Sequence, residues 1–222
     1  MKKPLVVLTL ALLLACAGTA AAADGSAHYS VKFTRLWTQK SHPFEYPPAA
    51  IVGGPHFSGL IGASHNGAYK IFREGAKPTP GLEKLSEEGK HSPLDAEIKA
   101  AIASGKAGAL FETGAVRDED GVETTEVTVT SKFPMVSAVA MIAPSPDWFA
   151  GVADVNLMEG GKWVTTKTVD LYAYDSGGDD GTTYKADDKD TNPKKPTMSA
   201  STRHFLANGK KVRVATLTFT RE

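Results

Sequence analysis

The chain has 222 residues, enough for one large domain or two small ones, and 41% of them are hydrophobic, as in an ordinary globular protein. Basic and acidic side chains balance at 25 each, so no net positive charge favours binding to nucleic acid. The one cysteine, Cys16, excludes an intramolecular disulfide, so an exported domain of this composition would depend on its core or on a metal for stability.

The first 23 residues have the layout of a secretory signal peptide. Lys2 and Lys3 precede an uncharged apolar run, and small residues then lead to Ala23, after which we expect cleavage. The apolar run is too short to span a bilayer comfortably, so no transmembrane span is predicted. The residues before Cys16 also resemble a lipobox, which makes a lipid anchor at that cysteine the alternative. Both interpretations predict export, with a mature domain over 24–222 that is secreted, periplasmic or held at the cell envelope.

The first half of the mature chain predicts one strand and two helices. Alternating apolar residues predict a half-buried strand over 29–37, and the proline-rich segment 42–55 predicts irregular structure. Two short helices are predicted over 79–89 and 92–105, each ending at a glycine. Helices placed between strands favour one domain with helical insertions.

The second half is predicted to be mainly β structure. The continuous apolar run 135–143 is typical of a central strand that is buried on both faces. Further strands are expected from 124 onwards and over 148–157, 163–174 and 211–221, with a long loop over 175–196. The sequence therefore predicts an all-β fold, an antiparallel β-sandwich of six or seven strands with short helical insertions.

The three tryptophans are candidates either for the core or for a sugar-stacking platform. We expect Trp37 and Trp148 to lie in the core, and Trp163, which follows a glycine turn, to be the tryptophan exposed to solvent.

Aspartates at two predicted strand ends suggest a calcium site. Asp147 precedes one strand and Asp175 ends another, so neighbouring strands would bring them to one rim. Calcium takes six to eight oxygen ligands from carboxylates, carbonyls and waters, and glycine-rich acidic loops supply all three. Runs of aspartate and glycine are also typical of solvated turns, and the spacing does not match an EF-hand.

No sequence motif indicates an enzyme. The segment around Ser64 and His65 is not a nucleophile elbow, and the zinc-protease and phosphate-loop motifs are absent from the sequence. A structural role for His65 is therefore favoured over catalysis. Paired carboxylates for glycoside hydrolysis stay open, because their separation is a spatial property.

Several segments resemble the spondin N-terminal domain, which occurs in extracellular matrix proteins of the F-spondin and mindin type and in bacterial secreted proteins. The resemblance is carried by 144–149 (PSPDWF), 169–175 and 178–181, with 57–66 similar to the first half of that domain. It extends over essentially the whole mature chain.

The resemblance implies a β-sandwich similar to C2 domains, with a calcium ion at one edge. It implies that Asp147 and Asp175 are calcium ligands, that Glu126 is the third, and that Asp179 also contributes. The implied function is a binding or adhesion module, not an enzyme, with a structural metal and a cell-surface or matrix ligand that is a glycan, a lipid or a protein. The alternative is a calcium-supported hydrolase, for example one acting on glycans, whose catalytic residues the sequence does not identify.

Overall fold

The computed structural model describes residues 25–51 and 53–222, so the predicted signal peptide and Cys16 lie outside the described residues. Eight strands form most of the domain: β1 (Ser26–Arg35), β2 (His56–His65), β3 (Ala107–Val116), β4 (Val122–Thr130), β5 (Met135–Ala143), β6 (Trp148–Asn156), β9 (Thr166–Asp175) and β13 (Ala215–Arg221). The helices are α1 (Pro80–Glu88) and α2 (Leu94–Ala103). Short strands complete the fold: β7 (Met158–Glu159), β8 (Lys162–Trp163), β10 (Met198–Ser199), β11 (Leu206–Ala207) and β12 (Lys210–Lys211).

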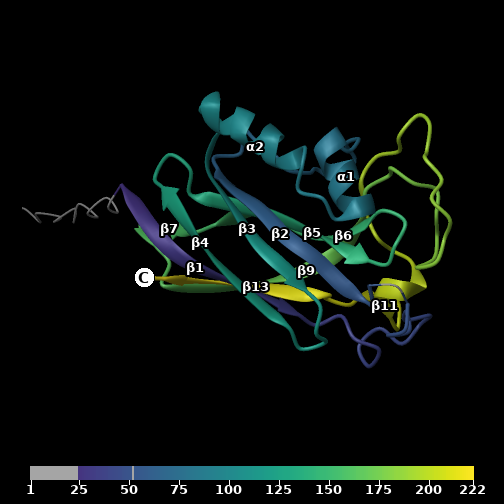
Figure 1. Cartoon of the computed structure of the whole chain (residues 1–222). Helices are drawn as coiled ribbons and strands as arrows, with labels where there is room; N and C mark the ends of the chain where they lie inside the picture. Colours follow the sequence, from purple (N-terminus) through teal and green to yellow (C-terminus); the bar gives the residue numbers. More distant parts are fainter. Residues whose placement is uncertain (1–24, 52) are drawn as a thin grey trace, which may run out of the picture.

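The eight strands make one antiparallel sheet that curls back on itself. Its order is β3-β2-β5-β6-β9-β13-β1-β4, with β10 added beside β9. The two edge strands, β3 and β4, lie next to each other, so the sheet is nearly closed (Figure 1). The predicted all-β antiparallel fold is confirmed, while the likeness to C2 domains stays a prediction.

Two hydrophobic clusters share this sheet. Alternate residues of β1 point into the interior, where Tyr29, Val31 and Phe33 are fully buried. The second cluster lies between the outer face of the sheet and the two helices (Figure 1). Strand β5 contributes Ala138 to the interior and Val139 to the helix side, which confirms the prediction that it is buried on both faces.

The helices begin and end where the sequence predicts. The side chain of Thr79 accepts a hydrogen bond from the Leu82 N–H at 3.2 Å and so caps α1, and Gly89 ends the helix in the left-handed region with φ of 66°. Leu82 and Leu85 of this helix pack onto the sheet, where they contribute to burying Phe149. This packing fixes the remaining face of α1 beside the loop that follows β9.

The tryptophan predictions have mixed outcomes. Trp37 and Trp148 are fully buried, as expected. The prediction for Trp163 is wrong, because its exposure is 7% and it belongs to the interior cluster. The β7–β8 hairpin folds back over the end of the sheet, where Tyr29 donates a hydrogen bond to the Val164 carbonyl at 2.6 Å.

Among residues 25–51 and 53–222, no helix has the length and the apolar character needed to cross a lipid bilayer.

Candidate functional site

Asp147 and Asp175 lie together at one rim of the sheet. Strands β6 and β9 are neighbours, and their register places Trp148 opposite Asp175. The chain then turns back, since the Ser176 N–H donates to the Asp147 carbonyl at 3.2 Å. The prediction that these two strand ends share a rim is therefore confirmed.

The two carboxylate oxygens of Asp147 have different environments. The residue is 0% exposed, and its Oδ2 accepts hydrogen bonds from Ser176 Oγ at 2.9 Å, from the Gly178 N–H at 2.8 Å and from the Asp179 N–H at 3.2 Å. Its Oδ1 is equally buried and has no hydrogen-bond partner within the described residues. Burial raises the pKa of this carboxyl above its usual value, against the effect of the three donors. A buried oxygen without a partner is costly, and a cation would satisfy it.

Asp175 adds a second carboxylate in the same place. Burial, and then the charge of Asp147, raise its pKa to about 6. Its Oδ1 accepts a hydrogen bond from the Gly177 N–H at 3.0 Å, which helps to form the turn after β9. Because the charge of Asp147 disfavours ionisation of Asp175, a proton or a cation at this rim would be favoured.

A third carboxylate, Glu87, reaches the rim from α1. A β-carbon added to Gly178 would lie 2.5 Å from Glu87 Oε1, so the side chain rests directly against the turn that binds Asp147. Its Oε1 is buried and has no hydrogen-bond partner in the described part of the chain. Burial, and then the charge of Glu83, raise the pKa of Glu87 to about 7. Sequence reasoning missed this residue, because it lies in a run of charged residues that is typical of a solvated helix face.

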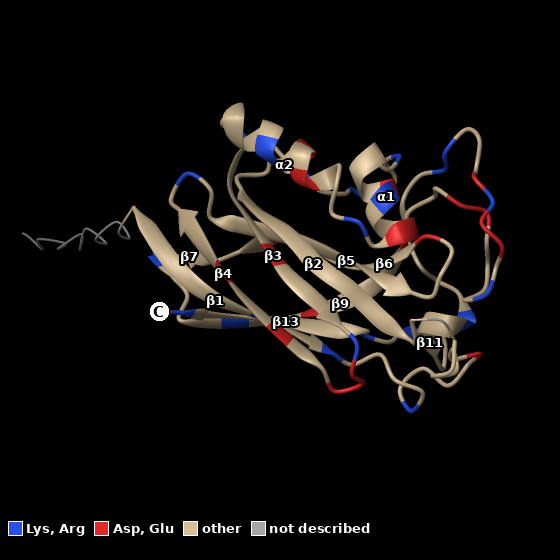
Figure 2. Ribbon diagram, in the orientation of Figure 1, with Lys and Arg blue, Asp and Glu red and all other residues tan. Residues whose placement is uncertain are grey.

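Lys194 neutralises the neighbouring acidic residues of the same region. Its ammonium lies 2.8 Å from Glu83 and 3.5 Å from Asp190, and it donates a hydrogen bond to the Gly178 carbonyl at 3.2 Å. Figure 2 shows acidic and basic residues interspersed along the loop that follows β9. Glu83 and Asp190 therefore have a cationic partner. The charge of Lys194 also acts to lower the pKa of Glu87, whose carboxylate lies within 4.8 Å of theirs, whereas Asp147 Oδ1 has no hydrogen-bond partner in the described residues.

The other two predicted ligands lie in different surroundings. Both carboxylate oxygens of Asp179 accept backbone hydrogen bonds, from the N–H groups of Gly181 and Lys189, so this buried residue organises the long loop. Glu126 is in the middle of β4, where its neighbours are His28 and Glu222. Glu126 is level in the register with Thr166, the first residue of β9, whereas Asp147 adjoins Asp175, the last residue of that strand, so the structure does not bring Glu126 to the rim.

The Ser64–His65 pair has structural roles. Ser64 Oγ accepts the Ala109 N–H at 2.8 Å. His65 is fully buried, and its Nδ1 accepts the Gly67 N–H at 3.1 Å, so its proton is on Nε2, which donates to Ser137 Oγ at 2.7 Å. An imidazole with this tautomer cannot take the proton of that serine, so the geometry does not form a nucleophile–base pair.

The donors at the rim are carboxylates, the type of ligand that a hard cation prefers, although the carboxylates whose oxygens lie within 4.8 Å of one another are those of Glu83, Glu87 and Asp190. Three carboxylates approach the 176–179 turn, two of them carry buried oxygens without partners, and no histidine is among them. Calcium prefers oxygen ligands at about 2.3–2.6 Å and tolerates irregular geometry, which suits carboxylates that arise from a helix and two strand ends.

Comparison with known proteins gives the family of the chain. The profile of the Spondin_N family matches residues 27–209. Human Spondin-2 is 36% identical over 189 residues, which are 79% of this chain and 56% of that protein. Spondin-1 of Xenopus laevis is 32% identical over 177 residues, which are 77% of this chain and 21% of that protein. This chain thus spans about half the length of the Spondin-2 relatives and about a fifth of the Spondin-1 relatives. With a family profile matched over most of the described domain, the chain belongs to the Spondin_N family.

Proposed function

We propose that this chain is an exported binding module whose rim holds one structural calcium ion and positions loops for an extracellular ligand. The observation that carries the proposal is the Oδ1 of Asp147, a fully buried carboxylate oxygen without a partner in the described residues. A buried oxygen without a partner lowers the free energy of unfolding unless a hydrogen-bond donor or a cation binds it. The signal-peptide pattern and the family membership support a role outside the cytoplasm.

In this proposal the calcium ligands are Asp147, Asp175 and Glu87, with waters or backbone carbonyls completing the shell. Glu87 replaces Glu126, the third ligand implied by the sequence resemblance. The side chain of Glu87 lies against Gly178, whereas Glu126 is on β4, opposite Ser30. Asp179 supports the turn through its own hydrogen bonds, and its direct binding to metal stays a prediction.

The metal is proposed to be structural rather than catalytic. The rim offers carboxylates and backbone groups but no histidine, and the buried Ser137–His65 pair has the wrong tautomer for catalysis. We therefore favour binding of a cell-surface or matrix ligand over hydrolysis. The ligand class, whether glycan, lipid or protein, remains part of the proposal.

The test is thermal melting of the protein with calcium, with magnesium and with a chelator. A ligand at a hundredfold excess over its Kd adds about 2.7 kcal/mol to the free energy of unfolding, which for a domain of this size is a rise in Tm of roughly 5–10 °C. We expect calcium to produce this rise in the wild type and not in Asp147→Asn. Glu126→Gln is the matched control, and it should respond like the wild type. Equal melting of the wild type in all three conditions would exclude the calcium site.

A further inference from the structure

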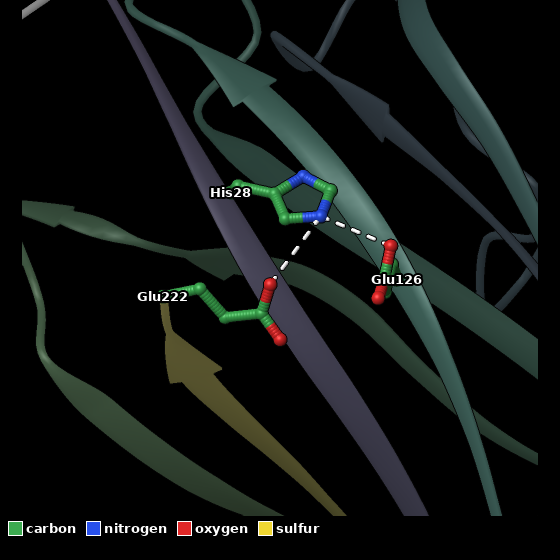
Figure 3. A group of neighbouring side chains, drawn as sticks. All are labelled: His28, Glu126 and Glu222. Carbon is green, nitrogen blue, oxygen red and sulfur yellow. Dashed lines mark hydrogen bonds and ion pairs between the residues drawn. The ribbon is translucent and has the colours of Figure 1, made fainter.

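The residue that the rim does not use, Glu126, belongs to a second group of potential metal ligands. His28 of β1, Glu126 of β4 and Glu222, which follows β13, bring three side chains together on the outer face of the sheet. Figure 3 shows the imidazole between the two carboxylates, with both of them directed at the same ring nitrogen. We propose that these three side chains form a binding site for zinc or a similar transition-metal ion.

The distances between the ligand atoms suit a tetrahedral ion. His28 Nε2 is 3.1 Å from Glu126 Oε2 and 3.6 Å from Glu222 Oε2. All three ligand atoms lie within 4.8 Å of one another. Two ligands of tetrahedral zinc, each bonded at about 2.0–2.2 Å, are separated by about 3.3–3.5 Å. The two distances from the imidazole nitrogen are therefore close to those that a tetrahedral zinc ion requires.

The imidazole is already oriented for this role. Its other nitrogen, Nδ1, is hydrogen-bonded to Thr128 Oγ1 at 3.1 Å. Metal-binding histidines are usually held in this way through the nitrogen that does not bind the metal, and loss of such a partner weakens metal affinity about 10–100-fold. Thr128 is outside the ligand group, and its contact holds the imidazole of His28 with Nε2 directed at the two carboxylates.

The backbone beneath the group is rigid. Strand β1 pairs with β4 on one side and with β13 on the other, and Thr128 lies directly opposite His28 in the register. The Glu222 N–H donates to the His28 carbonyl at 3.0 Å, which ties the third ligand to the first. Ligands on paired strands lose little conformational freedom when they bind an ion.

The chemistry of this group differs from that of the calcium rim. One imidazole and two carboxylates favour zinc, copper or nickel over calcium and magnesium, which prefer oxygen ligands. The three side chains are roughly half-exposed, so an ion held by them keeps a coordination position open to solvent. The ion would be exchangeable and accessible to a ligand from outside the molecule.

The test is calorimetric titration of tag-free protein with zinc chloride, followed by the visible absorption of bound cobalt(II), whose intensity reports tetrahedral geometry. We expect the wild type to bind one equivalent of zinc in the micromolar range. His28→Gln and Glu126→Gln should each bind at least tenfold more weakly, and Thr128→Val, which lacks the partner of Nδ1, should also lose about tenfold in affinity. These side chains are exposed, and circular dichroism will verify that the variants fold.

Two control variants test whether zinc binds at the His28 group and not elsewhere on the protein. His91 also pairs with a single glutamate, Glu112, at 2.8 Å, and His91→Gln should bind zinc like the wild type. Asp147→Asn should also keep full zinc affinity, and His28→Gln should keep any response to calcium, so the two sites can fail separately. Absence of zinc binding by the wild type, or equal affinity in wild type and His28→Gln, would overturn the proposal.

Discussion

The carboxylate of Glu87 is expected to lower the stability of the fold when no cation is bound and to raise it when a cation is bound. Its ionised form is disfavoured by burial and by the charge of Glu83, and its pKa is raised to about 7. At pH 8 the side chain is charged, and this charge destabilises the metal-free fold. The same charge would contribute to binding when calcium is present.

We therefore expect Glu87→Gln to reverse the order of stability between the two conditions. In chelator at pH 8 the variant should unfold at a higher temperature than the wild type, by about 1–2 kcal/mol in free energy of unfolding. In saturating calcium it should unfold at a lower temperature, because a ligand is missing. Scanning calorimetry in both conditions measures the effect.

The matched control for this variant is Glu88→Gln on the same helix. Glu88 forms ion pairs with Lys84 and Lys90, which lower its pKa, and it lies at the solvent. The Glu88→Gln variant should therefore show the same rise in Tm with calcium as the wild type. A calcium response in Glu87→Gln equal to that of the wild type would remove Glu87 from the ligand set.

The candidate site could be predicted from sequence only in part, because spatial proximity decides it. Asp147 and Asp175 were identified because each adjoins a strand end, and neighbouring strands place their ends together. Glu87 is distant in sequence from both of them and comes to the rim through the packing of α1. Glu126 was misplaced because the family resemblance alone assigned its role, whereas its position in β4 directs it to His28.

At the scale of elements, two strands cannot be predicted from the sequence pattern, for a steric reason. Strands β2 and β3 contain glycines, which weaken the alternating pattern that indicates a strand. In β2 these glycines are required by neighbours, since a β-carbon at Gly62 would overlap the Phe111 ring and one at Gly59 would overlap the Thr113 carbonyl. The helices were predictable because their caps and apolar faces are local features.

The turn that follows β9 depends on one glycine in a comparable way. Gly177 has φ of 83°, and a β-carbon there would overlap the Lys195 carbonyl oxygen. The turn supplies the N–H groups that bind Asp147. We expect Gly177→Ala to lower the free energy of unfolding by about 2 kcal/mol or more, since the strain and the overlap add together, and to weaken the calcium response. Urea denaturation and melting with calcium measure the two effects.

Gly160 in the β7–β8 turn provides the comparison for this variant. Its φ is 57°, but no atom lies within 4 Å of an added β-carbon. Gly160→Ala should therefore cost only the conformational strain, about 1 kcal/mol, and leave the calcium response intact. Similar effects of the two variants would show that the rim turn has no special steric requirement.

At the scale of the whole molecule, buried groups of two kinds give opposite dependences of stability on pH. Burial lowers the pKa of His65, so between the folded and unfolded pKa values the imidazole is protonated in the unfolded chain and neutral in the folded one. Its contribution to stability is present above about pH 6.5 and is lost as the pH falls from there towards the folded pKa. Glu87 and Asp175 have raised pKa values, about 7 and about 6, so their contribution is present at low pH and is lost as the pH rises through these values.

We expect His65→Gln to isolate the first effect. The variant should be less stable than the wild type at pH 8, because buried packing is disturbed, and the difference should shrink as the pH falls from 6.5 to 5. The free energy of unfolding from urea titrations at each pH, with chelator present, provides the measurement. A difference that is constant over this range would show that His65 does not titrate with unfolding.

The nearly closed sheet has a mechanical consequence. The Asp147 rim and the His28 group lie at opposite ends of the sheet, because β9 runs from Thr166, which is level with Ser30 in the register, to Asp175, which lies opposite Trp148. If each end holds a partner, a pulling force between them is directed along the strands. Neighbouring strands would then have to slide past each other, and many interstrand hydrogen bonds would have to break together rather than one after another. Such a domain would resist tension between two surfaces better than one whose hydrogen bonds break one after another.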